Sequence, residues 1–189
     1  MLESLEQFDQ ELFLFLNGLH QPWLDQVMFY MTKAVSWIPI YLLLLYLVVK
    51  TYDWKIMLWS LLAIAVVITL SDRISVELFK EVFQRYRPSR NLIIGPQAHI
   101  VNDYRGGLYG FVSSHATNFF GIATFVALLI RKNYPKAVPF LVLWASFICY
   151  TRVYLGVHYP SDIVAGSLLG ATIGFSVYKL FKVLLLKEK

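Results

Sequence analysis

Residues 151–162 read Thr-Arg-Val-Tyr-Leu-Gly-Val-His-Tyr-Pro-Ser-Asp and bring three groups of chemical interest together: Arg152, His158 and Asp162. Asp162 follows His158 by four residues, so its carboxylate can accept the Nδ1 proton and leave Nε2 free as a nucleophile. The segment lies between two long apolar stretches, where charged groups are costly and by default mark a functional site. It therefore predicts nucleophilic chemistry at a membrane surface.

A second segment carries two cations suited to binding an anion. Lys80 and Arg87 are seven residues apart, so on a continuous helix that ends before the following proline they share one face. Arginine offers a bidentate fork and lysine a point charge, which together suit an anion with several oxygens. The alternative is a basic interfacial helix, with further solvated charges at Arg73, Arg85 and Arg90.

The third segment, Ser113-Ser114-His115, lies where an apolar stretch gains helical character. Either serine would serve as an N-cap, and the free amides of the first helical turn favour an anion. His115 in that turn could donate a proton to a departing oxygen. A simple cap followed by an interfacial histidine is the alternative. Taken together, the three segments describe a site that attacks a phosphate ester.

Apolar stretches with short polar breaks must position these groups. The chain is 58% hydrophobic and 15% charged, whereas soluble chains average about 25% charged residues. We interpret the stretches as five spanning helices lengthened by flanking interfacial residues; a soluble helical bundle is the alternative. The stretches cover residues 34–49, 56–71, 106–130 (helical from Ser113 or Ser114), 137–151 and 163–178.

Two regions are not expected to span. In residues 1–20, four acids alternate with Leu and Phe near helical spacing, which predicts a helix lying in the membrane interface. Residues 72–113 are helix-like up to Tyr86 and a loop from Pro88 to Gly110. The predicted fold is one all-α domain over residues 1–189, an integral membrane helical bundle of about five transmembrane helices plus the interfacial helix.

Five crossings put the two termini on opposite sides of the membrane. One face then receives nine basic residues: Lys50, Lys55, Arg131, Lys132, Lys136, Lys179, Lys182, Lys187 and Lys189. The positive-inside tendency places that face in the cytoplasm. We therefore predict a multi-pass protein of the cell (inner) membrane with its site on the periplasmic, extracytoplasmic face.

The three segments together resemble the motifs of the type 2 phosphatidic acid phosphatase superfamily, which also contains the vanadium haloperoxidases. The family pattern is Lys-x6-Arg-Pro, then Pro-Ser-Gly-His, then Ser-Arg-x5-His-x3-Asp. Here it reads Lys80 with Arg87-Pro88, Val112-Ser113-Ser114-His115, and Thr151-Arg152 with His158 and Asp162. Val112, Ser114 and Thr151 stand where the family has proline, glycine and serine.

The resemblance implies roles for eight residues. His158 would attack phosphorus to give a phospho-histidine, Asp162 would orient it, and His115 would protonate the leaving oxygen. The phosphoryl oxygens would be held by Lys80, Arg87, Ser113 and Arg152, and the backbone amide of Ser114 would approach phosphate. No metal or other cofactor is implied, because fixed cations neutralise the phosphoryl charge.

The function predicted is a membrane phosphatase acting on a lipid phosphate or diphosphate. Undecaprenyl diphosphate is the preferred substrate, because the chain is small and the site is expected to face outward. Phosphatidylglycerophosphate, phosphatidic acid and a lipid A phosphate are the alternatives. Lipid substrate and membrane lipids are the expected partners, and the dispersed net charge of +5 gives no reason to expect nucleic acid.

Three other functions fit the residues less well. A vanadate-dependent haloperoxidase shares the anion pocket but is typically soluble. A non-enzymatic protein that binds lipid or transports an anion would not need His158 and Asp162 at this spacing. A metal hydrolase using the histidines and Asp162 is disfavoured because three nearby cations would repel the metal ion.

Overall fold

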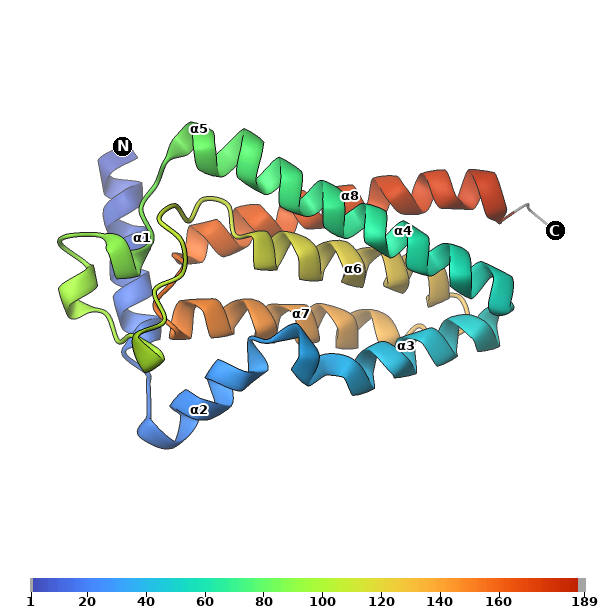
Figure 1. Cartoon of the computed structure of the whole chain (residues 1–189), viewed down its shortest axis with the longest axis horizontal. Coiled ribbons are helices and arrows are strands. Elements are labelled where there is room, and N and C mark those ends of the chain that lie inside the picture. Colours follow the sequence, from blue (N-terminus) through green and yellow to red (C-terminus); the bar gives the residue numbers. More distant parts are fainter. Residues whose placement is uncertain (1, 187–189) are drawn as a thin grey trace.

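The computed structural model describes residues 2–186, which form a bundle of helices (Figure 1). Long helices run side by side along the molecule, and α1 lies across one end. The elements are α1 (Leu2–Asn17), α2 (Pro22–Met31), η1 (Ala34–Trp37), α3 (Ile38–Thr51), α4 (Trp54–Arg73), η2 (Ile74–Lys80), α5 (Glu81–Phe83), η3 (Pro88–Arg90), η4 (Gly95–Gln97), η5 (Val101–Asp103), α6 (Ser114–Ile130), α7 (Ala137–Tyr154) and α8 (Pro160–Leu185).

Each predicted apolar stretch is a helix, and the prediction of an all-α membrane bundle is confirmed. Within residues 2–186, four helical segments are long and apolar enough to cross a membrane: Ala34–Thr51, Trp54–Phe83, Ala137–Tyr154 and Pro160–Leu185. The remaining one, α6, is apolar and 17 residues long. It packs against α3, α4, α7 and α8, so most of its side chains face other helices rather than lipid.

The second span is longer than predicted. Helix α4 continues through the π-helical η2 into α5 and ends at Phe83, instead of stopping near Ser71. Its polar residues have partners: Asp72 accepts a hydrogen bond from Asn118 Nδ2 of α6 at 2.8 Å, and Arg73 pairs with Glu77 of the same helical segment at 2.7 Å. Lys80 therefore lies near the end of a spanning segment.

Lys80 and Arg87 do not share a helix, so the prediction of one continuous helical face was wrong. Gln84 adopts a left-handed conformation (φ 47°) that ends the helix, and Arg87 is extended. Pro88 accounts for the extended backbone of Arg87, but the helix has already ended three residues earlier, at Gln84. The chain turns at Gln84, and the Arg87 amide bonds the carbonyl of Leu108 at 3.2 Å.

Helices α6 and α8 touch through their backbones. Gly166, Gly170 and Gly174 recur every four residues on α8, on the face that also carries Asp162. A methyl group at Gly170 would lie 2.2 Å from the carbonyl oxygen of Thr117 on α6. Small residues at this spacing allow close helix packing in membranes. The contact fixes the distance between the parts of the site carried by the two helices.

Helix α1 lies across the end of the bundle that carries the motif loops (Figure 1). Phe13 is buried against Ile94, Val153 and Tyr159. The opposite face exposes apolar side chains, as a helix in the membrane interface requires: Leu5, Phe8 and Phe15.

The predicted basic face lies at the other end of the bundle. The α3–α4 and α6–α7 connections and the C-terminal end of α8 gather there, at the right of Figure 1. Of the nine basic residues, Lys187 and Lys189 lie outside the described residues.

Candidate active site

His158 lies in the tight loop between α7 and α8. Gly156 adopts a left-handed conformation (φ 74°), and a side chain there would lie 2.8 Å from the carbonyl oxygen of His99. Its own carbonyl accepts a hydrogen bond from the Ser89 amide at 3.0 Å. The His158 side chain is almost completely buried, so neighbouring segments hold the imidazole in one place.

Asp162 contacts His158 from the first turn of α8. Pro160 occupies the first helical position, which suits proline because that residue needs no N–H. The Asp162 carboxylate reaches back and accepts hydrogen bonds from the Tyr159 amide at 3.0 Å and from His158 Nδ1 at 3.2 Å. Tyr159 is the N-cap of α8, so Asp162 is the third residue of the helix.

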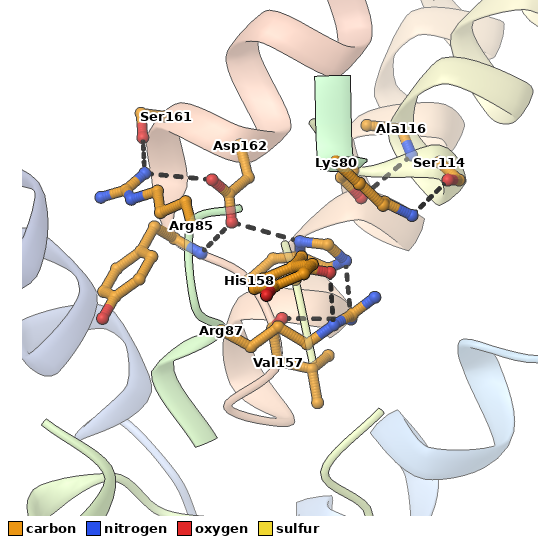
Figure 2. Close-up of polar contacts among 12 residues, drawn as sticks. Lys80, Arg85, Arg87, Ser114, Ala116, Val157, His158, Ser161 and Asp162 are labelled. Atoms are coloured by element: carbon orange, nitrogen blue, oxygen red, sulfur yellow. Dashed lines mark hydrogen bonds and ion pairs between the residues drawn. The ribbon is translucent and has the colours of Figure 1, made fainter. Parts of the chain in front are cut away.

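The hydrogen bonds of His158 determine which nitrogen carries the proton. A carboxylate only accepts and a guanidinium only donates, so Nδ1 donates to Asp162 and Nε2 accepts from Arg87 Nη1 at 3.0 Å. Figure 2 shows the imidazole between these two groups. The Nε2 lone pair is thus directed toward the cations.

Burial, reinforced by the nearby Arg87, Arg152 and Lys80, lowers the pKa of His158 well below its ordinary value. The neutral imidazole is the nucleophilic form. Burial and the charge of Arg152 also lower the pKa of Arg87, to about 10, so its guanidinium stays charged at neutral pH. An anion beside these groups would relieve their mutual repulsion.

Lys80 is held by the side chain of Ser114. Its Nζ donates to Ser114 Oγ at 2.6 Å, and Ser75 Oγ lies 2.7 Å from the same oxygen. Ser113 is the N-cap of α6, as predicted, and accepts from the Ala116 amide at 3.4 Å. Ser114, where the family pattern has glycine, therefore adds a hydroxyl that fixes the lysine.

Arg152 lies in the last turn of α7 and is 2% exposed. Its Nη1 donates to Thr32 Oγ1 at 2.8 Å, and its Nη2 donates to the Tyr104 hydroxyl at 3.2 Å. Nε is buried and has no hydrogen-bond partner among the described residues. A buried guanidinium nitrogen without a partner is costly, and a bound anion would satisfy it.

His115 lies in the first turn of α6 and is partly buried. It interacts electrostatically with Arg152, His158 and Arg87, so it belongs to the same cluster. It also lines a cavity of about 440 Å³. Helices α3, α4 and α6 supply most of the apolar wall, through residues such as Leu44, Leu45, Ile64, Ile68, Phe119 and Ile122.

The structure thus brings all eight predicted site residues to one end of the bundle. There the end of the helical segment that begins with α4 meets the start of α6, the end of α7 and the start of α8. Their arrangement places a neutral imidazole beside three cations, a helix N-terminus and a second histidine. This combination favours attack on a phosphorus atom whose oxygens are held by fixed positive charge.

Arg85, a solvated charge in the alternative interpretation of this segment, is instead held by two carboxylates. Its Nη1 donates to Asp162 Oδ1 at 3.0 Å, and its Nη2 donates to Asp9 Oδ2 at 2.8 Å. Burial opposes the charged form, but the carboxylates of Asp162 and Asp9 prevail and raise the pKa of Arg85.

Sequence reasoning also missed close neighbours of the site. Thr32 and Tyr104 contact Arg152 from segments far away in the chain, and no local pattern marks them. Gly110 was assigned only to a loop, yet a side chain there would lie 3.0 Å from Asp162 Oδ2 and 3.6 Å from His158 Nδ1. The glycine permits the loop to cover this pair closely.

Comparison with protein families identifies the chain. The family model described as the PAP2 superfamily matches residues 57–185, which include all three motifs. The chain belongs to the PAP2 superfamily. The assignment made from the motifs is confirmed, and with it the assignment as a lipid phosphatase that spans the membrane several times.

Relatives within the superfamily match almost the whole chain. A lipid A 4'-phosphatase of Bacteroides thetaiotaomicron is 42% identical, over 94% of this chain and 79% of the relative. A lipid A 4'-phosphatase of Porphyromonas gingivalis is 30% identical, over 95% of this chain and 75% of the relative. The crystal structure of a transmembrane PAP2-type phosphatidylglycerolphosphate phosphatase from Bacillus subtilis has the same fold: TM-score 0.73, 20% identity, 98% of this chain and 90% of that one.

Proposed function

We propose that this PAP2 phosphatase removes a phosphate group from a lipid A-type glycolipid through a phospho-histidine intermediate on His158. The observation that carries the mechanism is the orientation of His158: Nδ1 donates to Asp162, and the Nε2 lone pair points among the cations. Undecaprenyl diphosphate, the preference from sequence, stays a prediction. The lipid A headgroup takes precedence because relatives named for it match 94% and 95% of the chain.

The reaction takes place in two steps. In the first, His158 Nε2 attacks phosphorus, the bond to the lipid oxygen breaks, and protonated His115 gives its proton to that oxygen. In the second, His115 takes a proton from water, whose oxygen attacks the phospho-histidine and releases inorganic phosphate. Asp162 holds the Nδ1 proton throughout and stabilises the positive charge that the imidazole gains.

Fixed charges supply the stabilisation of the transferring phosphoryl group. Lys80 approaches from the end of η2, Arg87 from the loop that follows α5, and Arg152 from α7. The first amides of α6 add the positive end of a helix dipole. The unpartnered Nε of Arg152 is matched to an equatorial phosphoryl oxygen. Before reaction, such an oxygen replaces His158 Nε2 as the acceptor of Arg87 Nη1.

The cavity supports a lipid as the substrate. His115, the proposed proton donor to the leaving oxygen, lines the cavity. The leaving oxygen therefore lies beside the apolar wall. A phosphate bound among the cations would leave its lipid portion at this wall, where burial of apolar surface contributes to binding. A water-soluble phosphate ester would leave that surface without a partner.

The cellular placement belongs to the same proposal. The basic connections at the far end of the bundle favour a cytoplasmic location for that end. The active site then opens on the periplasmic face of the inner membrane, where the interfacial helix α1 lies at the level of the lipid headgroups.

The test is phosphate release by the purified protein in detergent from a panel of lipids. The panel contains lipid A, undecaprenyl diphosphate, phosphatidylglycerophosphate and phosphatidic acid at matched mole fractions. We expect the highest kcat/KM for lipid A. A higher value for undecaprenyl diphosphate would overturn the substrate assignment without affecting the mechanism.

The mechanism has its own test. His158→Ala should lower kcat by at least about 1,000-fold, because no other group takes the place of the nucleophile. Brief exposure of wild type to lipid labelled in the phosphate should leave acid-labile, base-stable label on the protein, and His158→Ala should leave none. Equal rates of release by the two proteins would refute the mechanism.

A further inference from the structure

Arg85 contacts the catalytic pair from behind. The Asp162 carboxylate lies between Arg85 and His158 (Figure 2): Oδ1 accepts from Arg85 at 3.0 Å, and Oδ2 faces His158 Nδ1 at 3.2 Å. Arg85 is therefore on the side away from the attacking Nε2. Because one planar carboxylate contacts both groups, a rotation of the carboxylate imposed by Arg85 also shifts the oxygen that faces the imidazole.

Arg85 is itself held by the interfacial helix. Asp9 on α1 accepts a hydrogen bond from Arg85 Nη2 at 2.8 Å and from the Ser161 amide at 2.9 Å. The Ser161 hydroxyl also donates to Asp9. Asp9 is 8% exposed, whereas Glu3, Glu6 and Glu11 of the same helix are exposed. Asp9 is thus the acid of α1 that is directed into the protein.

Charge balance explains why Asp162 needs this partner. Its side chain is completely buried, and a buried carboxylate requires both an opposite charge and hydrogen bonds. His158 is neutral and supplies only a hydrogen bond. Arg85 supplies the positive charge at Oδ1, and Asp9 in turn holds the second half of the guanidinium.

Arg85 is not placed to bind the substrate phosphate. Its two terminal nitrogens are occupied by Asp9, Asp162 and Ser161. Its guanidinium carbon lies 4.2 Å from the centre of the Tyr159 ring. These contacts fix the plane of the guanidinium and direct both nitrogens at carboxylates, so any effect of Arg85 on phosphate passes through Asp162.

We propose that Asp9 and Arg85 are positioning residues for catalysis, and that helix α1 thereby completes the active site as well as anchoring the protein in the interface. Asp9 orients Arg85, Arg85 orients the Asp162 carboxylate, and that carboxylate orients His158. The inference rests on the proposed function of His158 as the nucleophile. The family model begins at residue 57, so Asp9 lies outside the segment that defines the superfamily here.

The experiment compares kcat and KM for lipid phosphate hydrolysis by Arg85→Lys, Asp9→Asn and Asp9→Glu. Lysine keeps the charge but cannot reach both carboxylates, and asparagine keeps the shape of Asp9 without its charge. We expect Arg85→Lys and Asp9→Asn to lower kcat by about 10- to 100-fold, the range typical of groups that orient a reacting residue. KM should change less than about threefold, because the phosphate-binding cations are untouched.

Asp9→Glu separates charge from packing. Because it restores the carboxylate, it should retain more activity than Asp9→Asn, whereas a role in shape alone gives the reverse order. The double variant Arg85→Lys with Asp9→Asn should lose little more than the worse single variant, since both act through one carboxylate. Glu11→Gln on α1 and Arg73→Lys on α4, both exposed, are the matched controls and should behave as wild type.

The inference and the proposed function fail differently. The positioning role alone is overturned if the wild type is active and the kcat values of Arg85→Lys and Asp9→Asn stay within about twofold of the wild-type kcat. An effect of these variants that is confined to KM overturns it as well. Asp9→Glu no better than Asp9→Asn does so as well. Undiminished activity of His158→Ala overturns the proposed mechanism, and the positioning role with it. Melting temperature and gel filtration in detergent establish that each variant compared is folded.

Discussion

Gly170→Ala should force α6 and α8 apart. A methyl group at Gly170 would lie 2.2 Å from the Thr117 carbonyl oxygen and 2.8 Å from its carbonyl carbon, whereas ordinary contact begins at 3.4 Å. Both atoms belong to the backbone of α6, so no rotation of a side chain relieves the overlap. The helices must separate locally by about 1 Å, since the close-packed interior offers no other adjustment.

The expected effects follow from that displacement. Overpacking of this size destabilises by about 1–3 kcal/mol, which corresponds to about 2–12 °C in melting temperature for a chain of this length. The same contact joins the two halves of the site, because the Ser113 amide donates to the Asp162 carbonyl at 3.1 Å. A displacement of about 1 Å between reacting groups can lower turnover about 100-fold.

The assay measures melting temperature in detergent and kcat for lipid phosphate hydrolysis. Gly107→Ala is the control, because a methyl group there meets nothing within 4 Å, and it should behave as wild type. If Gly170→Ala matches this control in both measurements, the backbone contact between α6 and α8 does not set the geometry of the site, and the reasoning is refuted.

Three further predictions concern the charges of the site. Native His158 stays neutral, whereas in the unfolded chain its imidazole takes up a proton below the ordinary pKa of 6.5, so the free energy of unfolding is highest above that pH and falls as the pH is lowered. Chemical unfolding in mixed micelles should show a loss of about 2 kcal/mol between pH 7 and 5, and His158→Gln should lack this loss. An unchanged pH slope in His158→Gln would contradict the assignment. Tyr104→Phe removes a partner of Arg152 Nη2 and should raise KM about 10-fold with kcat nearly unchanged; a loss confined to kcat would count against a role in binding. Strong chelators should leave phosphate release within about twofold of the untreated rate, because Lys80, Arg87 and Arg152 supply the positive charge; inactivation that added metal ions reverse would show the opposite.

The sequence predicted those parts of the site that local spacing determines. His158 and Asp162 are four residues apart at the start of a helix, so their hydrogen bond is a local matter. Ser113 as the N-cap of α6 is local as well. The spans were predictable because apolar length is a property of a continuous segment.

Contacts between distant segments were not predictable. Arg85 and Asp9 are separated by 76 residues, and no local pattern distinguishes Asp9 from the three glutamates of α1 or Arg85 from its neighbouring arginines. The end of the second span was also misjudged. The chain reverses at Gln84 through a left-handed residue, and glutamine carries little intrinsic preference for that conformation.

The tie between α1 and the start of α8 has a consequence for biosynthesis. Translation delivers the first helix early, and the Asp162 carboxylate that we propose it aligns only after more than four-fifths of the chain. A nascent polypeptide that stops before residue 158 already carries cations able to attract phosphate, but it lacks the proposed nucleophile, His158. If His158 is the nucleophile, as proposed, hydrolysis can begin only after residue 158 has been made, and it reaches its full rate once the start of α8 has met the first helix.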